Sequence, residues 1–78
     1  MSLKDAIRLR ILELCRENGL TVNGLCAVAG INQSTICNII GGRNHSTDIS
    51  TIQKICDGLE IDLPVFFDSD VFQNLEKL

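Results

Sequence analysis

Apolar side chains recur at helical spacing along most of this 78-residue chain, beginning near its N-terminus. Ile7, Ile11 and Leu14 fall at i, i+4 and i+7, the spacing that places side chains on one face of an α-helix. Gly19 follows, and glycine readily adopts the left-handed conformation with which many helices end. The pattern therefore predicts a first helix over residues 3–18.

Two shorter helices joined by a tight turn are predicted next. Thr21 is a suitable N-cap for a helix that ends at Gly30. Asn32 is a suitable N-cap for the following helix, which we expect over residues 33–40 with its isoleucines on one face. Two short helices in this arrangement predict a helix-turn-helix.

The remainder of the chain predicts further short helices. The fourth is expected to start at Thr47 or Asp48, and the fifth to be capped by Asp62. Ser69 or Asp70 is expected to cap a last helical turn or two. The apolar stripe of the fourth helix consists of Ile49, Ile52, Ile55, Cys56 and Leu59.

These elements make all-α the expected fold class. A domain usually contains about 100–150 residues, so this chain is long enough for one domain only. A domain of about 60 residues buries only about 60% of the surface that its unfolded chain exposes, so we expect modest stability, to which dimerisation adds. The helices are short and the loops tight, which predicts a compact five-helix bundle; a short extra C-terminal helix is left open.

The charges are distributed unevenly along the chain, although the net charge is −3. All ten carboxylates lie at or before Glu17 or at or after Asp48, and Arg43 is the only formal charge between these two residues. Residues 1–47 carry five bases and three acids, whereas residues 48–78 carry two bases and seven acids. Because a central segment without acids favours the approach of a phosphate backbone, DNA is the leading partner. The alternative is that this segment lacks acids by chance or because it is buried.

Several other classes of protein are disfavoured by the composition. The longest apolar runs are a few residues long, and no cationic stretch precedes an apolar one at the N-terminus, so we expect a cytoplasmic protein that neither enters a membrane nor is exported. His45 is the only histidine and no Cys-x-x-Cys pair occurs, which disfavours a zinc site. No pair of nucleophile and base is evident. We therefore expect no enzymatic activity, cofactor, metal or small-molecule ligand.

Five groups of residues carry a family resemblance. They are Gly19-Leu20-Thr21, Leu25-Cys26, the run from Ala29 to Ile36, Gly42-Arg43-Asn44, and Ile49 to Leu59 followed by Ile61-Asp62-Leu63. Together they resemble the lambda-repressor-like helix-turn-helix family, the Cro/C1 or xenobiotic-response-element type of prokaryotic and phage regulators. The resemblance implies a five-helix lambda-repressor-like bundle, with a helix-turn-helix DNA-binding domain over residues 1–68 and a C-terminal helical extension over residues 69–78.

The predicted helix over residues 33–40 carries polar side chains opposite its isoleucines. Glutamine and asparagine amides match the paired acceptor and donor on the major-groove edge of adenine. The resemblance implies that Gln33, Ser34 and Asn38 meet base edges; the alternative is a face that only contacts solvent. It also implies contacts with the DNA backbone, although some of these residues are also suited to caps, turns or an exposed charge. The expected backbone contacts are Thr21, Asn32, Thr35, Arg43 and Asn44.

Several positions depart from the family, which favours polar residues where this chain has Gly24, Ala27 and Ile40. The family usually places a phosphate-binding glutamine where this chain has Val22. With Arg43 as the only cation in the central segment, a single subunit is expected to bind DNA weakly and with a shallow dependence on salt. A dimer that reads two half-sites about one helical turn (34–36 Å) apart would restore useful affinity.

These observations lead to one functional hypothesis and one alternative. We expect a sequence-specific transcriptional regulator, a repressor and a homodimer, that binds double-stranded DNA through the major groove with the helix over residues 33–40. The alternative is a protein-interaction module of the same fold, an antitoxin or a regulatory partner, with weak or lost DNA binding. The hypothesis requires the amides of Gln33 and Asn38 to face outward and away from the acidic C-terminal half.

Overall fold

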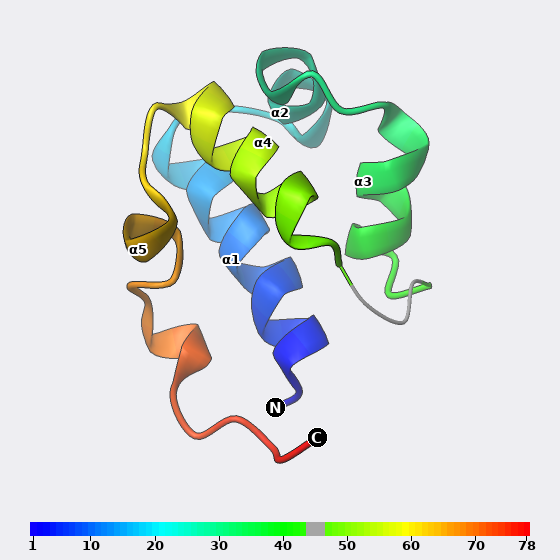
Figure 1. Ribbon diagram of the computed structural model, residues 1–78. Coiled ribbons are helices and arrows are strands. Elements are labelled where there is room, and N and C mark those ends of the chain that lie inside the picture. The colour runs from blue at the N-terminus through cyan, green and yellow to red at the C-terminus, as the bar shows by residue number, and fades with distance from the viewer. Residues whose placement is uncertain (44–46) are drawn as a thin grey trace.

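The helices begin and end close to the capping residues expected from the sequence. A computed structural model describes residues 1–43 and 47–78 (Figure 1). This part of the chain contains five α-helices and no strand, which confirms the all-α class. The elements are α1 (Leu3–Glu17), α2 (Val22–Ala29), α3 (Gln33–Ile40), α4 (Ile49–Leu59), α5 (Leu63–Phe66) and the 3-10 turn η1 (Asp70–Phe72).

Local hydrogen bonds fix the boundaries of α2 and α3. The hydroxyl oxygen of Thr21 accepts a hydrogen bond from the Gly24 N–H at 3.0 Å, and this bond caps α2. Gly30 ends α2 with a φ of 67°, in the left-handed region that glycine adopts without a steric penalty. Asn32 then caps α3, so the predicted helix-turn-helix is present with its turn at Gly30.

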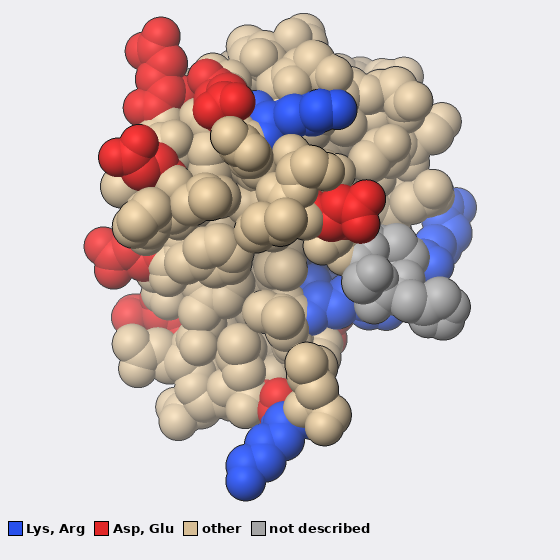
Figure 2. Space-filling view, viewed as in Figure 1, with Lys and Arg blue, Asp and Glu red and all other residues tan. Residues whose placement is uncertain are grey.

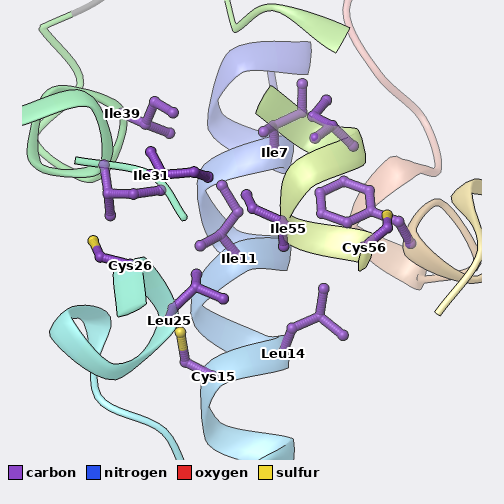
Figure 3. Packing of buried hydrophobic residues seen from close by; sticks show 13 residues of the cluster. Ile7, Ile11, Leu14, Cys15, Leu25, Cys26, Ile31, Ile39, Ile55 and Cys56 are labelled. Atoms are coloured by element: carbon purple, nitrogen blue, oxygen red, sulfur yellow. The ribbon is translucent and has the colours of Figure 1, made fainter. Parts of the chain in front are cut away.

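Each helix contributes side chains to one core. In Figure 1, α1 passes through the centre of the molecule, with α2 across one end and α3 and α5 on opposite sides. The side chains of Ile11, Leu25 and Ile55 point toward one another between α1, α2 and α4 (Figure 3). The largest fully buried residues are Phe66, Ile11, Leu25, Ile36, Ile52, Ile55 and Cys56.

Helices α2 and α4 are in close contact at Gly58. A Cβ atom built on Gly58 would lie 2.6 Å from the carbonyl oxygen of Val28 and 2.8 Å from the Cα of Ala29. Atoms do not approach this closely without repulsion, so the absence of a side chain at Gly58 is what allows the two helices to pack together.

The buried Arg10 joins α1 to the C-terminal part of the chain. Its Nε donates to the carbonyl of Phe66 at 2.6 Å, and its Nη2 donates to the carbonyl of Val65 at 2.9 Å. Its Nη1 is paired with the carboxylate of Glu13, which also accepts a hydrogen bond from the Ser69 hydroxyl at 3.0 Å. One ion pair on α1 therefore holds both α5 and the segment that leads into η1.

Two apolar residues near the ends of predicted helices lie at the surface. Ile49 belongs to the predicted stripe of α4 but is 61% exposed, because it lies at the end of α4 remote from the contact that Gly58 makes with α2. The last helical segment is a single 3-10 turn that does not reach Leu75 or Leu78, and Leu78 is fully exposed. The division of the chain at residue 68 stays a prediction. Within the described residues, no helix has the length and apolar character needed to span a membrane.

Candidate nucleic-acid interface

Two buried isoleucines orient α3. Ile36 and Ile39 are 0% and 4% exposed, and they direct one side of α3 into the core. The opposite side is exposed over Gln33, Ser34 and Asn38. The structural requirement for base reading is therefore met, since both amides face outward; the base contacts themselves stay a prediction.

A pair of side chains fixes the N-terminal end of α3. The carboxamide oxygen of Asn32 accepts from the N–H of Thr35 at 3.0 Å and from its hydroxyl at 3.2 Å. This capping role was expected as the alternative to phosphate contact, and the two roles are compatible because the Asn32 side chain is exposed. The N–H groups of the first turn of a helix lack partners within the helix and are directed toward whatever lies beyond its N-terminus.

The start of α2 is linked to the start of α3 by a contact that the sequence did not reveal. Gln33 Nε2 donates a hydrogen bond to Asn23 Oδ1, and both side chains are exposed. Val22, which occupies the position where the family has its phosphate-binding glutamine, packs partly buried against the core. Asn23 is the only residue of α2 with an amide or hydroxyl side chain, and this is the signal that would have identified it.

Two basic side chains lie near the C-terminal end of α3. Lys4, from the first turn of α1, donates from Nζ to the carbonyl of Gly42 at 3.2 Å. Arg43 is exposed, and its Nε lies 3.5 Å from the position that a Cβ on Gly41 would take. Lys4 was not predicted because it lies 38 residues from Gly42 in the sequence. Asn44, which was expected to contact the DNA backbone beside Arg43, lies outside the described residues.

The acidic side chains lie mostly on the side of the molecule away from α3. In Figure 2 most of them gather along the edge formed by α5 and the end of α4. One acidic side chain lies nearer to α3, whose outer edge shows basic but no acidic side chains. The exposed acids of this C-terminal half include Asp57, Glu60, Asp62, Asp68 and Asp70. The face of α3 is thus accessible to a polyanion despite the negative net charge.

The cysteines differ in environment. Cys15, Cys26 and Cys56 are buried, and burial raises the pKa of each thiol above its ordinary value. Cys37 is a free cysteine exposed on the outward side of α3. Over residues 1–43 and 47–78, no three His, Cys, Asp or Glu side chains gather where they could hold a metal ion.

Comparison with known proteins agrees with this geometry. The family model of the Cro/C1-type HTH DNA-binding domain matches residues 10–64. A search of curated proteins finds no match. The crystal structure of prophage Lp1 protein 11 is similar, with a TM-score of 0.80 and 34% sequence identity over 90% of this chain and 93% of that chain. Because the family model covers more than half of its residues, this chain belongs to the Cro/C1-type helix-turn-helix DNA-binding domains.

Proposed function

We propose that this protein is a sequence-specific transcriptional repressor that inserts α3 into the major groove of double-stranded DNA. The observation that carries the proposal is the exposed, acid-free side of α3, which presents the amides of Gln33 and Asn38. Gln33, Ser34 and Asn38 read base edges, where each well-matched pair of hydrogen bonds is worth about 1–3 kcal/mol of discrimination. The protein acts in the cytoplasm through occupancy of its site and not through catalysis.

Contacts with phosphates set the register of α3 on the duplex. Thr21 caps α2, the Asn32–Thr35 pair caps α3, and Arg43 follows the C-terminal end of α3. Asn44, the next residue in the sequence, is proposed to contact phosphate beside Arg43. The Lys4 ammonium, held beside Gly42, adds a second cation near Arg43. Such contacts contribute affinity for every sequence, whereas discrimination comes from the base edges.

The protein binds DNA as a homodimer. Few cations flank α3, so one subunit gains little affinity from counterion release. The longest dimension of the molecule is 33 Å, close to the spacing of about 34–36 Å between half-sites one helical turn apart. A dimer whose two α3 helices lie at this spacing would present them to successive major grooves on one side of the duplex.

A selection from a randomised duplex pool, followed by mobility-shift titrations of the selected sequence, tests the proposal. We expect Gln33→Ala to relax the preference at one base position. We expect Arg43→Ala to weaken binding to all duplexes alike and to reduce the slope of log affinity against log salt by about 1. Gln53→Ala, which removes an exposed amide on α4, is the matched control and should bind as the wild type does.

Two outcomes would contradict the proposal. Equal losses on all duplexes from Gln33→Ala and Arg43→Ala would mean that Gln33 does not read a base. No shift of the pool even at low salt, together with a partner protein recovered by pull-down, would favour the alternative of a protein-interaction module. The partly buried Val22 and the few cations around α3 are what favour that alternative.

A further inference from the structure

We propose that Asn23 is a positioning residue that orients the carboxamide of Gln33 and thereby determines how strictly this protein selects its base. This inference rests on the proposed function, in which Gln33 reads a base edge. It starts from one contact: Gln33 Nε2 donates a hydrogen bond to Asn23 Oδ1 across the helix-turn-helix. Both residues lie in the first turns of their helices, on the exposed side.

The chemistry of the amide makes this contact consequential. A glutamine carboxamide has two N–H donors and one carbonyl acceptor. When one N–H is donated to Asn23, the other N–H and Oε1 remain side by side, and these are the two groups that adenine N7 and N6 require. With Asn23 Oδ1 facing Gln33, rotating the Gln33 amide by 180° would bring its oxygen against the oxygen of Asn23, so this orientation of the Asn23 amide favours one order of donor and acceptor on Gln33.

The position of Asn23 also restricts the motion of Gln33. A free glutamine side chain loses up to about 2 kcal/mol of rotational entropy when it is fixed in one conformation. A hydrogen bond made before DNA arrives removes part of that cost from the binding step. The neighbouring Val22 packs against the core, and the rest of α2 has no amide or hydroxyl, so Asn23 is the residue of α2 suited to this role.

A double-mutant cycle tests the inference. Wild type, Asn23→Ala, Gln33→Ala and the double variant are titrated against the selected duplex and against its three single-base variants at the position where Gln33→Ala loses preference. We expect Asn23→Ala to reduce discrimination at that position about three- to ten-fold, and we expect the double variant to match Gln33→Ala. The unfolding midpoint of each variant is measured to verify folding.

A conservative variant gives a second readout that a merely structural role would not produce. Asn23→Asp keeps the oxygen that accepts from Gln33 but adds a negative charge. We expect it to retain the discrimination of the wild type while binding every duplex more weakly. Gln53→Ala again serves as the control.

The possible failures can be told apart. If Asn23→Ala discriminates as the wild type does, or if its effect adds to that of Gln33→Ala, the inference is overturned while the proposed function stands. If Asn23→Asp loses discrimination as Asn23→Ala does, the accepting oxygen is not what matters, and the inference fails as well. If the wild type binds no duplex, the proposed function fails and the inference fails with it.

Discussion

At the scale of single residues, two glycines inside helices have opposite surroundings. Gly58 touches the backbone of α2, whereas a Cβ on Gly24 would meet the Thr21 hydroxyl oxygen at 3.3 Å and the Leu20 side chain at 3.5 Å. Helix propensity alone favours alanine over glycine at both positions by about 1 kcal/mol. Packing therefore determines whether each substitution to alanine raises or lowers the free energy of unfolding.

We expect Gly58→Ala to lower the free energy of unfolding by about 1–3 kcal/mol, since α2 must move away from α4 to accommodate the methyl group. Gly24→Ala, the matched control, should be neutral or stabilising because the neighbouring side chains can shift. Urea unfolding followed by circular dichroism measures both changes. A stabilised Gly58→Ala variant would show that the close approach of the two helices is not required.

Lys4 offers a second test at this scale. We expect Lys4→Gln to weaken binding to all duplexes and to reduce the salt slope by about 1, as Arg43→Ala does, because each removes one cation near the C-terminal end of α3. The glutamine side chain is shorter than that of lysine but still carries an N–H donor for the Gly42 carbonyl. Lys77→Gln makes the same charge change at an exposed position in the C-terminal tail and should have a smaller effect. If Lys4→Gln and the wild type have the same slope of log affinity against log salt, Lys4 does not contact the DNA.

At the scale of elements, the short α5 depends on α1 for its position. A helix of four residues is not stable by itself, since isolated helices below about 12 residues are marginal in water. The guanidinium of Arg10 satisfies two carbonyls at the end of α5, and Phe66 fills the core beneath it. The rings of Phe66, Phe67 and Phe72 lie 5.0–6.2 Å apart and extend this contact to η1.

Glu13 makes the attachment of α5 dependent on pH. Burial alone would raise the pKa of Glu13, but the hydrogen bonds from Arg10 and Ser69 and the nearby positive charges outweigh it and hold the pKa below the ordinary value of 4.5. A carboxyl with a lowered folded-state pKa stabilises the fold above its unfolded-state pKa, and this contribution is lost as the pH falls through the folded-state value.

We therefore expect Glu13→Gln to destabilise the protein by about 1 kcal/mol at pH 7, and the difference from the wild type to shrink below pH 4.5. Urea unfolding at pH 7 and at about pH 3 measures the difference. Glu76→Gln, a carboxylate removed from an exposed tail position, is the control. A difference that is the same at both pH values would mean that the charge of Glu13 does not stabilise the fold.

At the scale of the whole molecule, the proposed DNA affinity depends on two copies acting together. We expect sedimentation of the complex to give two chains of 8.6 kDa for each selected duplex, and the selected sequence to contain two half-sites about 10–10.5 base pairs apart. Moving the half-sites apart by about 5 base pairs should abolish tight binding, because one site then faces the opposite side of the duplex. One chain per duplex, or indifference to the spacing, would contradict the homodimer.

Local signals in the sequence were sufficient to predict most of the fold. Thr21, Gly30 and Asn32 act on residues within one turn, so their capping and stopping roles could be predicted without knowledge of the tertiary structure. Burial was less predictable, because periodicity shows which residues share a face but not how far a neighbouring helix extends over it. Ile49 therefore follows the periodic pattern of α4 but remains exposed.

The candidate site was also only partly predictable from local signals in the sequence. That Gln33 and Asn38 face outward follows from their spacing relative to Ile36 and Ile39 within a single helix. The hydrogen bond between Asn23 and Gln33 and the contact of Lys4 with Gly42 join residues 10 and 38 positions apart. Contacts between different helices depend on how the helices are oriented, which hydrophobic periodicity does not specify.

The burial of α3 on one side only has a practical consequence for engineering. Its stability comes from Ile36 and Ile39, while Ser34, Cys37 and Asn38 are exposed. Substitutions at exposed positions usually change stability by no more than about 0.5 kcal/mol. The proposed function therefore predicts that the corresponding side chains of a relative, placed at the outer positions of α3, redirect the protein to another operator while the rest of the fold is kept.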